Sequence, residues 1–339
     1  MTGLPAPGVW TDIGGTSGKD EGNMIRPGKT WLDTDGNVIQ AHGGGVNFFN
    51  GRYYWYGENK TGCSAKQSEG KPWHAGANCY SSSDLYNWTF EGTVLPATSP
   101  EFGHELNPRR IMDRPHVLFN KANGIYVMWM KLVPANWQDQ HVGIATSPSP
   151  TGPFTLKKIL HPNGMCAGDA NLFAEASDGK AYYVFGRPHT EVVVADLTPD
   201  YLDTTGMYSC HFPQPGDPWG REAPAIFKHK HTYYMITSGT TGYRANEAQW
   251  ASAPLIHGPW TVHGNPCIGV GSGTTFDSQI TVVFEVADRP GCFIAMADRW
   301  NSEDIEASTY VWLPLQFRDG ILVINWFDEW DLSWFEKKH

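Results

Sequence analysis

The sequence predicts an all-β protein, a single five-bladed β-propeller over residues 1–339. Three observations predict this fold. Five short strands recur, each a turn followed by aromatic or β-branched residues; their spacing is that of one four-stranded blade; and no amphipathic helix of normal length stands between them. A two-sheet β-sandwich with long loops is the alternative architecture.

One aromatic residue marks each recurring strand. The markers are Tyr53, Tyr126, Tyr182, Tyr233 and Phe293, at successive steps of 73, 56, 51 and 60 residues. Gly, Trp and Tyr are abundant, with 37, 15 and 14 residues, which suits short strands joined by tight turns.

Each marker strand follows another apolar run, and a turn of the kind that links antiparallel neighbours joins the two. The leading runs are residues 42–49, 113–119, 168–175, 221–227 and 277–284, and their partners are residues 50–57, 123–130, 178–185, 229–237 and 289–297. Segments 81–92, 145–155 and 251–261 have the pattern expected of outer strands. The innermost strand of every blade lines the central channel of a propeller, so residues that open the leading runs should converge on one axis.

Polar residues open four of the leading runs: Asp113, Asp169, Glu222 and Gln279. Glu222 precedes an apolar strand, where partial desolvation predicts a raised pKa. Cleavage of a glycosidic bond needs such an acid, with a base or nucleophile on the other face of the sugar. Glu222 is therefore the candidate acid, and Asp169 the candidate carboxylate that tunes or orients it. The alternative for each residue is a turn residue that bonds its own backbone.

Candidate substrate-binding residues lie beside the same strand ends. Arg114, Arg221 and Arg299 could donate to sugar hydroxyls, and ordinary salt bridges are an equal interpretation. Among Trp55, Trp129, Trp219 and Trp300, we select Trp219 for stacking on a sugar, while most aromatics should fill the spaces between blades. His42 and Tyr243 complete the expected binding set.

Charge and hydropathy restrict the partners. The formal net charge of −10 argues against nucleic acid, and no run of eighteen apolar residues predicts a membrane span. A neutral oligo- or polysaccharide is the expected partner. The N-terminal residues MTGLPAPGVWTD lack the pattern of a signal peptide, so the chain is expected to be cytoplasmic, or secreted or periplasmic with its signal removed.

No cofactor is expected. The histidines at 42, 116, 189 and 211 match no metal-ligand spacing, and nothing indicates a structural Ca²⁺ ion in the channel. The six cysteines include no CxxC pair. Cys63 and Cys79 flank one Gly/Ser/Lys-rich loop. They could form a disulfide in an oxidising compartment, and the alternative is two reduced thiols.

The sequence resembles glycoside hydrolase family 43, five-bladed propeller hydrolases that act on polymers of arabinose, xylose and galactose. The resemblance extends over nearly the whole chain, through residues 33–60, SSSDLYNWTFEG, MDRPHVLFN, GREAPAIF, TSGTTGY, FDSQITVVF and residues 297–315. Within the family, these motifs are similar to those of the branch that holds exo-β-1,3-galactanases and certain furanosidases.

The resemblance implies roles for individual residues. Glu222 in REAPA matches the general acid, and Asp169 in AGDANLF matches the carboxylate that tunes its pKa and holds the sugar. Most members carry an Asp base on the first blade, where this sequence has Gly43 to Gly45. In the galactanase branch a fifth-blade glutamine is thought to act as the base in its imidic-acid form. Gln279 matches that glutamine, with Asp113 as the orthodox substitute.

The second blade departs from the galactanases, because it has DRPH where they usually have ERPK. The motifs MDRPH, AGD, TSGTTGY and SQI are more similar to a subgroup credited with α-L-arabinofuranosidase and β-D-galactofuranosidase activity. We therefore expect an exo-acting, inverting hydrolase that releases a terminal furanose from arabinogalactan-type or other polysaccharide side chains. An exo-β-1,3-galactanase is the alternative, and a non-catalytic carbohydrate-binding propeller is the alternative of another class.

Overall fold

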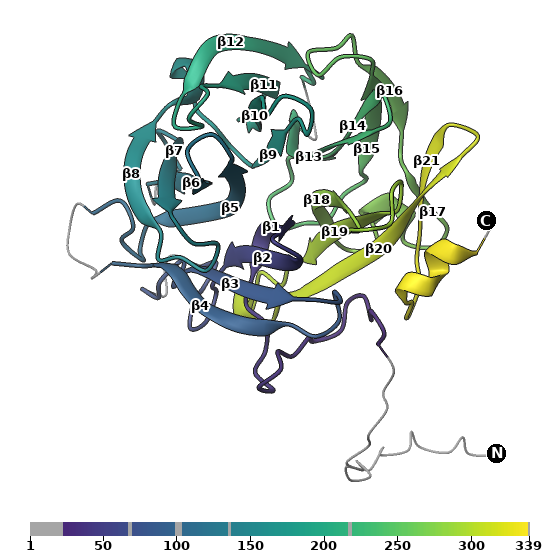
Figure 1. Ribbon diagram of the computed structural model, residues 1–339, viewed down its shortest axis with the longest axis horizontal. Helices are drawn as coiled ribbons and strands as arrows, with labels where there is room; N and C mark the ends of the chain where they lie inside the picture. The colour runs from purple at the N-terminus through teal and green to yellow at the C-terminus, as the bar shows by residue number, and fades with distance from the viewer. Residues whose placement is uncertain (1–22, 67–69, 99–103, 135–136, 216–218, 338–339) are drawn as a thin grey trace, which may run out of the picture.

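The computed structural model describes residues 23–66, 70–98, 104–134, 137–215 and 219–337, and it shows five β-sheets arranged as blades around a central axis (Figure 1). The first blade holds β1 (His42–Phe49), β2 (Arg52–Glu58), β3 (Gly76–Ser82) and β4 (Thr89–Pro96). The second holds β5 (Ile111–Asn120), β6 (Ile125–Val133), β7 (His141–Ser147) and β8 (Thr155–Leu160). The third holds β9 (Ala170–Ala174), β10 (Ala181–Arg187), β11 (Glu191–Leu197) and β12 (Thr204–His211).

The last two blades complete the ring. The fourth holds β13 (Arg221–His229), β14 (Thr232–Gly239), β15 (Gln249–Ala253) and β16 (Thr261–Gly264). The fifth holds β18 (Gln279–Glu285), β19 (Phe293–Arg299), β20 (Thr309–Arg318) and β21 (Ile321–Asn325), with the short β17 (Cys267–Ile268) parallel to β21 at its outer edge. The helices of the described residues are short 3₁₀ turns: η2 (Pro162–Gly164), η3 (Ser272–Thr274), η4 (Ile305–Ala307) and η5 (Leu332–Glu336). None of these helices is long and apolar enough to cross a membrane.

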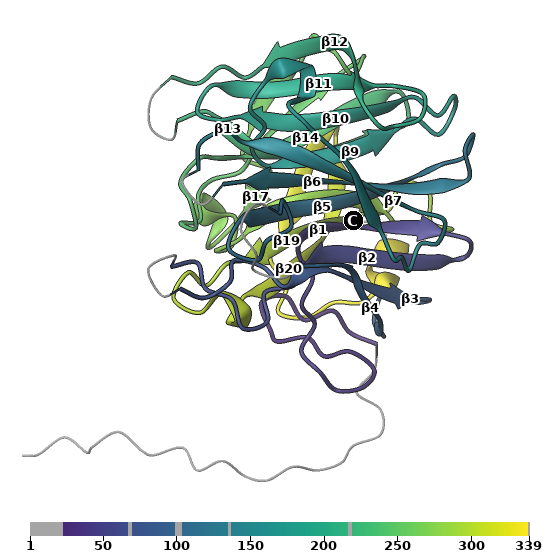
Figure 2. The ribbon, with the colours of Figure 1, turned by 90° about the vertical axis from the view of Figure 1, so that its left-hand side faces the viewer.

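This arrangement confirms the five-bladed β-propeller and excludes the sandwich. The predicted leading runs are β1, β5, β9, β13 and β18, and the predicted marker strands are β2, β6, β10, β14 and β19. Leading strands of neighbouring blades contact one another around the axis, as expected of innermost strands. The strands run across the body of the molecule and the loops gather at its two ends (Figure 2). The extent of the domain over 1–339 stays a prediction, because residues 1–22 and 338–339 lie outside the described residues.

Local sequence explains the hairpins within blades. Between β1 and β2 the pairing runs up to Phe49 and Arg52, which leaves a two-residue turn at Asn50 and Gly51. Both turn residues have positive φ, 50° and 81°, the conformation of the tight turn whose twist matches a β-hairpin. The Asn-Gly pair adopts it at low cost.

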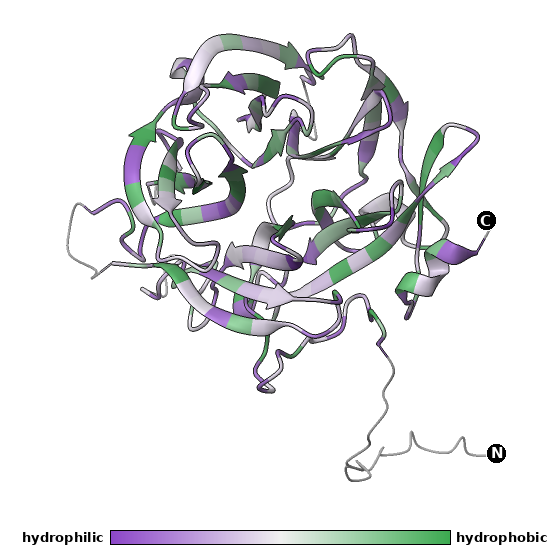
Figure 3. Ribbon diagram, viewed as in Figure 1, coloured by the Kyte–Doolittle hydropathy of each residue, from purple (hydrophilic) through white to green (hydrophobic). Residues whose placement is uncertain are grey.

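The core lies between neighbouring blades, where hydrophobic residues recur along the strands (Figure 3). The contact between the first and fifth blades is built on tryptophans. Trp55 and Trp312 are fully buried with ring centroids 4.9 Å apart, and Trp330 donates to the Trp312 carbonyl at 2.8 Å. Ile25 pairs with Trp330, so residues near both ends of the described chain meet at this contact.

A β-bulge interrupts four of the five innermost strands. In the first, second and fourth blades the bulge follows His42, Asp113 and Glu222, and the next residue has positive φ in each: Gly43 at 64°, Arg114 at 55° and Ala223 at 48°. The fifth blade has a register shift between Ile280 and Val282. A bulge re-aims the side chains beside it. These bulges set which residues face the mouth of the channel.

All six cysteines are described, and all six are free. Cys63 and Cys79 are buried, and the Sγ atom of each lies near backbone carbonyl oxygens, Asn59 O and Pro150 O among them. The structure therefore supports two reduced thiols.

Candidate active site

A pocket of about 290 Å³ opens where the innermost strands begin. All four predicted catalytic residues line it, and so do Arg114 and Tyr243 of the predicted binding set. Its lining residues are Glu58, Asp113, Arg114, Lys131, Trp137, Asp169, Glu222, Gly242, Tyr243, Gln279 and Trp300. The ring of blades brings together polar residues that are far apart in the sequence.

Glu222 is the second residue of β13, and its protonated carboxyl group is a proton donor in this pocket. Burial raises the pKa of Glu222 to about 8, and the negative charge of Asp169 adds to the rise. Gln279 Nε2 donates to Glu222 Oε1 at 3.2 Å and to Ser238 Oγ at 2.9 Å. A carboxyl group that stays protonated at neutral pH can give its proton to a leaving oxygen.

Asp169 lies one residue before β9 and is held by two cations. Arg114 Nη2 donates to Asp169 Oδ2 at 2.5 Å, and Lys131 Nζ donates to Asp169 Oδ1 at 3.1 Å. Burial alone would raise the pKa of Asp169, but Arg114 and Lys131 hold it well below its usual value. Asp169 therefore stays ionised, beside an acid that stays protonated. Two carboxyl groups whose surroundings push their pKa values apart are the pattern of an acid and its charged partner.

Arg114 connects Asp169 to Gln279. Its Nη2 atom also donates to Gln279 Oε1, and its backbone N–H donates to Glu58 Oε1 at 3.0 Å. The imidic-acid form of Gln279 would place a hydroxyl hydrogen on the oxygen that Arg114 already faces with a donor. In this arrangement Arg114 favours the ordinary amide form.

Glu58 fills the place of the missing first-blade carboxylate. A Cβ atom added to Gly43 would lie 2.1 Å from Glu58 Oε1, so the carboxylate of β2 occupies the space where a side chain at 43 would begin. Lys60 Nζ lies 2.7 Å from Glu58 Oε2. Burial raises the pKa of Glu58, and Lys60 opposes the rise. Sequence reasoning missed this residue. The signal was the polar break in WYGENK directly after the marker strand.

Asp113 is the fourth carboxyl group of the pocket. It accepts from Trp73 Nε1 at 3.0 Å, and its oxygens lie 3.6 Å from Lys60 Nζ and 3.8 Å from Lys131 Nζ. Burial would raise the pKa of Asp113, but the two lysines lower it below its usual value. Asp113 is therefore available as an ionised carboxylate.

Aromatic residues form the walls. Trp137, Tyr243 and Trp300 line the pocket, and the Tyr243 and Trp300 rings are 5.8 Å apart. Lys131 Nζ lies 5.2 Å from the Trp137 ring centroid. Lys131 and Trp137 were not selected from the sequence, because Lys131 lies near the end of the second strand of its blade and Trp137 follows that strand, and only the ring geometry turns them to the axis.

Four of the six predicted binding residues do not line this pocket: His42, Trp219, Arg221 and Arg299. His42 is fully buried, with Nδ1 2.9 Å from Asp298 Oδ1 and its ring 5.4 Å from that of Trp300, so it supports the pocket wall from behind. Arg299 donates to the Phe276 carbonyl at 2.8 Å and lines a second hollow that shares Tyr243, Gln279 and Trp300 with the pocket. Trp219 is 58% exposed and does not line the pocket.

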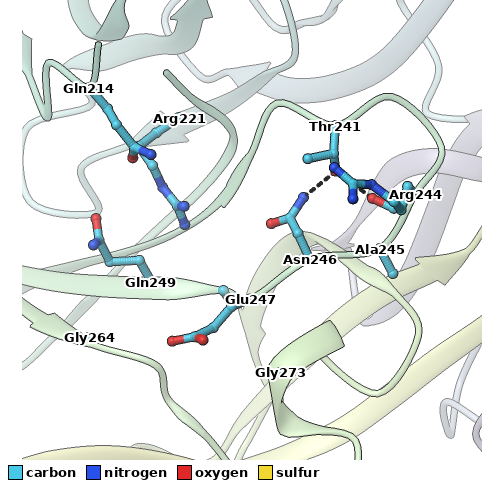
Figure 4. A pocket seen from close by; sticks show the side chains of 11 residues that line it. Gln214, Arg221, Thr241, Arg244, Ala245, Asn246, Glu247, Gln249, Gly264 and Gly273 are labelled. Carbon is cyan, nitrogen blue, oxygen red and sulfur yellow. Dashed lines mark hydrogen bonds between the residues drawn. The ribbon is translucent and has the colours of Figure 1, made fainter. Parts of the chain in front are cut away.

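Arg221 faces a third hollow, of about 430 Å³ (Figure 4). Arg221 and Glu222 are consecutive in the regularly paired part of β13, before its bulge, so their side chains point to opposite faces of the sheet. Arg221 Nε donates to Thr237 Oγ1 at 3.0 Å and Nη2 donates to the Thr237 carbonyl at 2.6 Å, and burial lowers the pKa of Arg221 to about 10. Arg244, Ala245 and Asn246 line both this hollow and the second one. A polar surface thus continues from the pocket along the loop that follows β14.

Comparison with known proteins identifies the family. The model of the glycosyl hydrolases family 43 matches residues 49–272. The chain belongs to glycosyl hydrolase family 43. The resemblance seen in the sequence is thereby confirmed.

Solved structures of this family are similar over most of the chain. A family 43 β-1,3-galactosidase is 35% identical, with a TM-score of 0.84, over 92% of this chain and 64% of that one. A second β-1,3-galactosidase, solved with galactodeoxynojirimycin, is 36% identical, with a TM-score of 0.83, over 91% and 100%. The exo-β-1,3-galactanase of Phanerochaete chrysosporium, solved with galactose, is 32% identical, with a TM-score of 0.80, over 91% and 68%.

Among curated proteins, the β-D-galactofuranosidase xynD of Aspergillus niger is 32% identical over 125 residues. The match covers 32% of this chain and 35% of that protein. The solved structures named β-1,3-galactosidase or exo-β-1,3-galactanase thus match nearly the whole described chain, whereas the match to the galactofuranosidase covers about a third of it.

Proposed function

We propose that this family 43 chain is an exo-acting hydrolase that releases galactose from β-1,3-linked galactan. The observation that carries the proposal is the pairing of a protonated Glu222 with an ionised Asp169 in one pocket. The substrate class is taken from the relatives, which are named β-1,3-galactosidases and exo-β-1,3-galactanases. These names support the galactanase, which was the alternative predicted from the sequence, more strongly than the furanosidase.

In the proposed reaction, Glu222 protonates the glycosidic oxygen as the bond to the sugar breaks. Asp169 keeps the pKa of Glu222 high and places a fixed negative charge beside the positive charge that develops on the ring. A water attacks from the opposite face with inversion. The reaction uses no cofactor.

Three residues are candidates to activate that water. Gln279 is the residue implied by the family resemblance, Asp113 is an ionised carboxylate, and Glu58 occupies the first-blade position. Arg114 stabilises the amide form of Gln279, which favours a role for Gln279 in orienting the water and for a carboxylate in taking its proton.

The furanosidase remains the second candidate function. It is supported by the match to the β-D-galactofuranosidase and by Asp113, which is one methylene shorter than the glutamate usual in galactanases. A binding protein without activity would have no use for the separated pKa values of Glu222 and Asp169.

A substrate panel tests the proposal. β-1,3-Galactan should be degraded from its end to free galactose, faster than p-nitrophenyl β-D-galactofuranoside and p-nitrophenyl α-L-arabinofuranoside are cleaved. The Glu222→Gln variant should lose about 10²- to 10⁴-fold in kcat on galactan while it still binds galactose. Preferential cleavage of a furanoside would establish the second candidate, and sugar binding without hydrolysis of any substrate would overturn both.

Azide separates the candidate bases. In Gln279→Ala, Asp113→Asn and Glu58→Gln, the variant that lacks the base should regain turnover with azide and yield a glycosyl azide of inverted configuration. Variants that only position the sugar should not recover. Recovery in none of the three would place the base elsewhere.

A further inference from the structure

A cluster of two histidines and an aspartate lies on the second blade, outside the pocket. Asp139, His141 and His161 place one ligand atom each within 4.8 Å of one another. His161 Nε2 is 2.8 Å from Asp139 Oδ1, and the two imidazole rings are 5.6 Å apart at 76°.

The pairing of two strands assembles this cluster. His141 opens β7 and His161 directly follows β8, and the register sets Val142 opposite Leu160. The two histidines are therefore neighbours in space although twenty residues separate them in the chain. Their spacing matches no sequence motif, which is why the sequence predicted no metal site.

The surroundings of His141 are those of a metal ligand. One ring nitrogen, Nδ1, lies 2.9 Å from the Asp139 carbonyl oxygen, and the other, Nε2, lies 3.4 Å from Glu105 Oε2. Whichever nitrogen of His141 binds an ion, the other nitrogen has an acceptor for its N–H. Arg110 Nη2 lies 2.7 Å from Glu105 Oε2 and holds that carboxylate in place. Metal-bound histidines almost always donate their second N–H to a carboxylate or carbonyl in this way.

We propose that Asp139, His141 and His161 bind one divalent transition-metal ion of the Zn²⁺ type. Two neutral imidazoles and one carboxylate are ligands that Zn²⁺ prefers, at about 2.0–2.2 Å, and small side-chain rotations would close the ligand atoms to that geometry. Asp139 is 67% exposed and His161 is 36% exposed, so water completes the coordination. The ion is structural, because the proposed hydrolysis uses no metal.

The site would fix a loop that reaches the active-site pocket. Trp137, a wall residue of the pocket, is two residues before Asp139. Its carbonyl accepts from Gln140 Nε2 at 3.3 Å, and the Gln140 carbonyl accepts from the Ala167 N–H at 3.0 Å. An ion that joins Asp139 and His141 to His161 would hold the C-terminal end of this loop against the residue that follows β8.

Metal uptake tests the site without reference to hydrolysis. Full-length protein without a histidine tag is treated with a chelator, dialysed against ZnCl₂ and analysed for bound zinc. We expect one ion per chain and a higher Tm with zinc. His161→Ala and Asp139→Asn should each weaken binding by at least about tenfold, and Glu105→Gln, whose carboxylate contacts His141 and Arg110, by about tenfold.

His257→Ala is the matched control. His257 makes a comparably exposed contact, 2.6 Å from Asp196 Oδ1, and Ser209 Oγ lies 2.7 Å from its other nitrogen. This variant should bind zinc like the wild type. The proposal is overturned if wild-type protein takes up no zinc, if His161→Ala binds it undiminished, or if His257→Ala loses it equally.

Discussion

At the scale of single residues, the distinctive feature is the contrast between two carboxyl groups in one pocket. The pKa of Glu222 is raised to about 8, and that of Asp169 is held well below its usual value. The difference comes from their partners, because Asp169 has Arg114 and Lys131 while Glu222 has the amide of Gln279.

The first consequence is a pH profile. Hydrolysis requires protonated Glu222, so kcat/KM should fall as pH rises through about 8. Asp169→Asn removes the charge that raises this pKa and frees Arg114 and Lys131 to lower it further. The alkaline limb of that variant should therefore move to lower pH, as measured on a chromogenic galactoside. If the alkaline limb of Asp169→Asn stays at the pH of the wild type, Asp169 does not raise the pKa of Glu222.

The second consequence is a pH-dependent stability. An unfolded glutamate has a pKa of about 4.3, so the raised folded value means that the ionisation of Glu222 opposes folding. The contribution of protonated Glu222 to the free energy of unfolding is fully present below about pH 4.3 and is lost as pH rises through about 8. Glu222→Gln cannot ionise. Its Tm should be about 1–3 °C above that of the wild type at pH 9 and the same as that of the wild type at pH 4, as followed by intrinsic fluorescence. An equal gain in Tm at both pH values would contradict this origin.

At the scale of elements, the glycines of HGGG are required by close packing of β1 against β2. A Cβ atom on Gly44 would lie 1.9 Å from the Tyr56 carbonyl oxygen, which is backbone and cannot rotate away. Gly44→Ala should therefore destabilise the protein by about 1–3 kcal/mol and lower activity, because β2 carries Glu58. Denaturant unfolding measures the loss. Gly273→Ala, where no atom lies within 4 Å of an added Cβ, is the control and should unfold like wild type.

At the scale of the whole molecule, aromatic packing closes the ring. The described strands of the fifth blade all come from the C-terminal part of the chain, so no strand of the first blade joins that sheet. Closure depends instead on the contact of Trp55 with Trp312 and on the pairing of Ile25 with Trp330.

Because aromatic contacts close the ring, truncating one of them should destabilise the whole propeller. Trp312→Ala should cost about 3–5 kcal/mol, because it empties a fully buried contact between two blades. The expected result is a lower denaturation midpoint with increased proteolysis of both terminal regions. Met207→Ala, at a residue 66% exposed on an outer strand, should leave the midpoint unchanged. A similar midpoint for both variants would show that the ring closes by other contacts.

The sequence by itself determined the number of blades and the polar residues at the strand openings. Strand alternation, tight turns and marker aromatics are local signals, and a ring of blades brings the openings together whatever their separation in the chain. For this reason Asp113, Asp169, Glu222 and Gln279 could be predicted to meet.

Only the tertiary structure decided which neighbours join them. Glu58 and Lys131 reach the pocket from second strands, where they pair with His42 and Asp113, the residues that directly precede two of the bulges. The physical reason is the bulge. Period-two alternation fixes the face of a side chain only along a regular strand, and each bulge resets it at the point where the pocket forms. Where Gly43 leaves room, the carboxylate of Glu58 fills it, and no pattern within either strand records that contact.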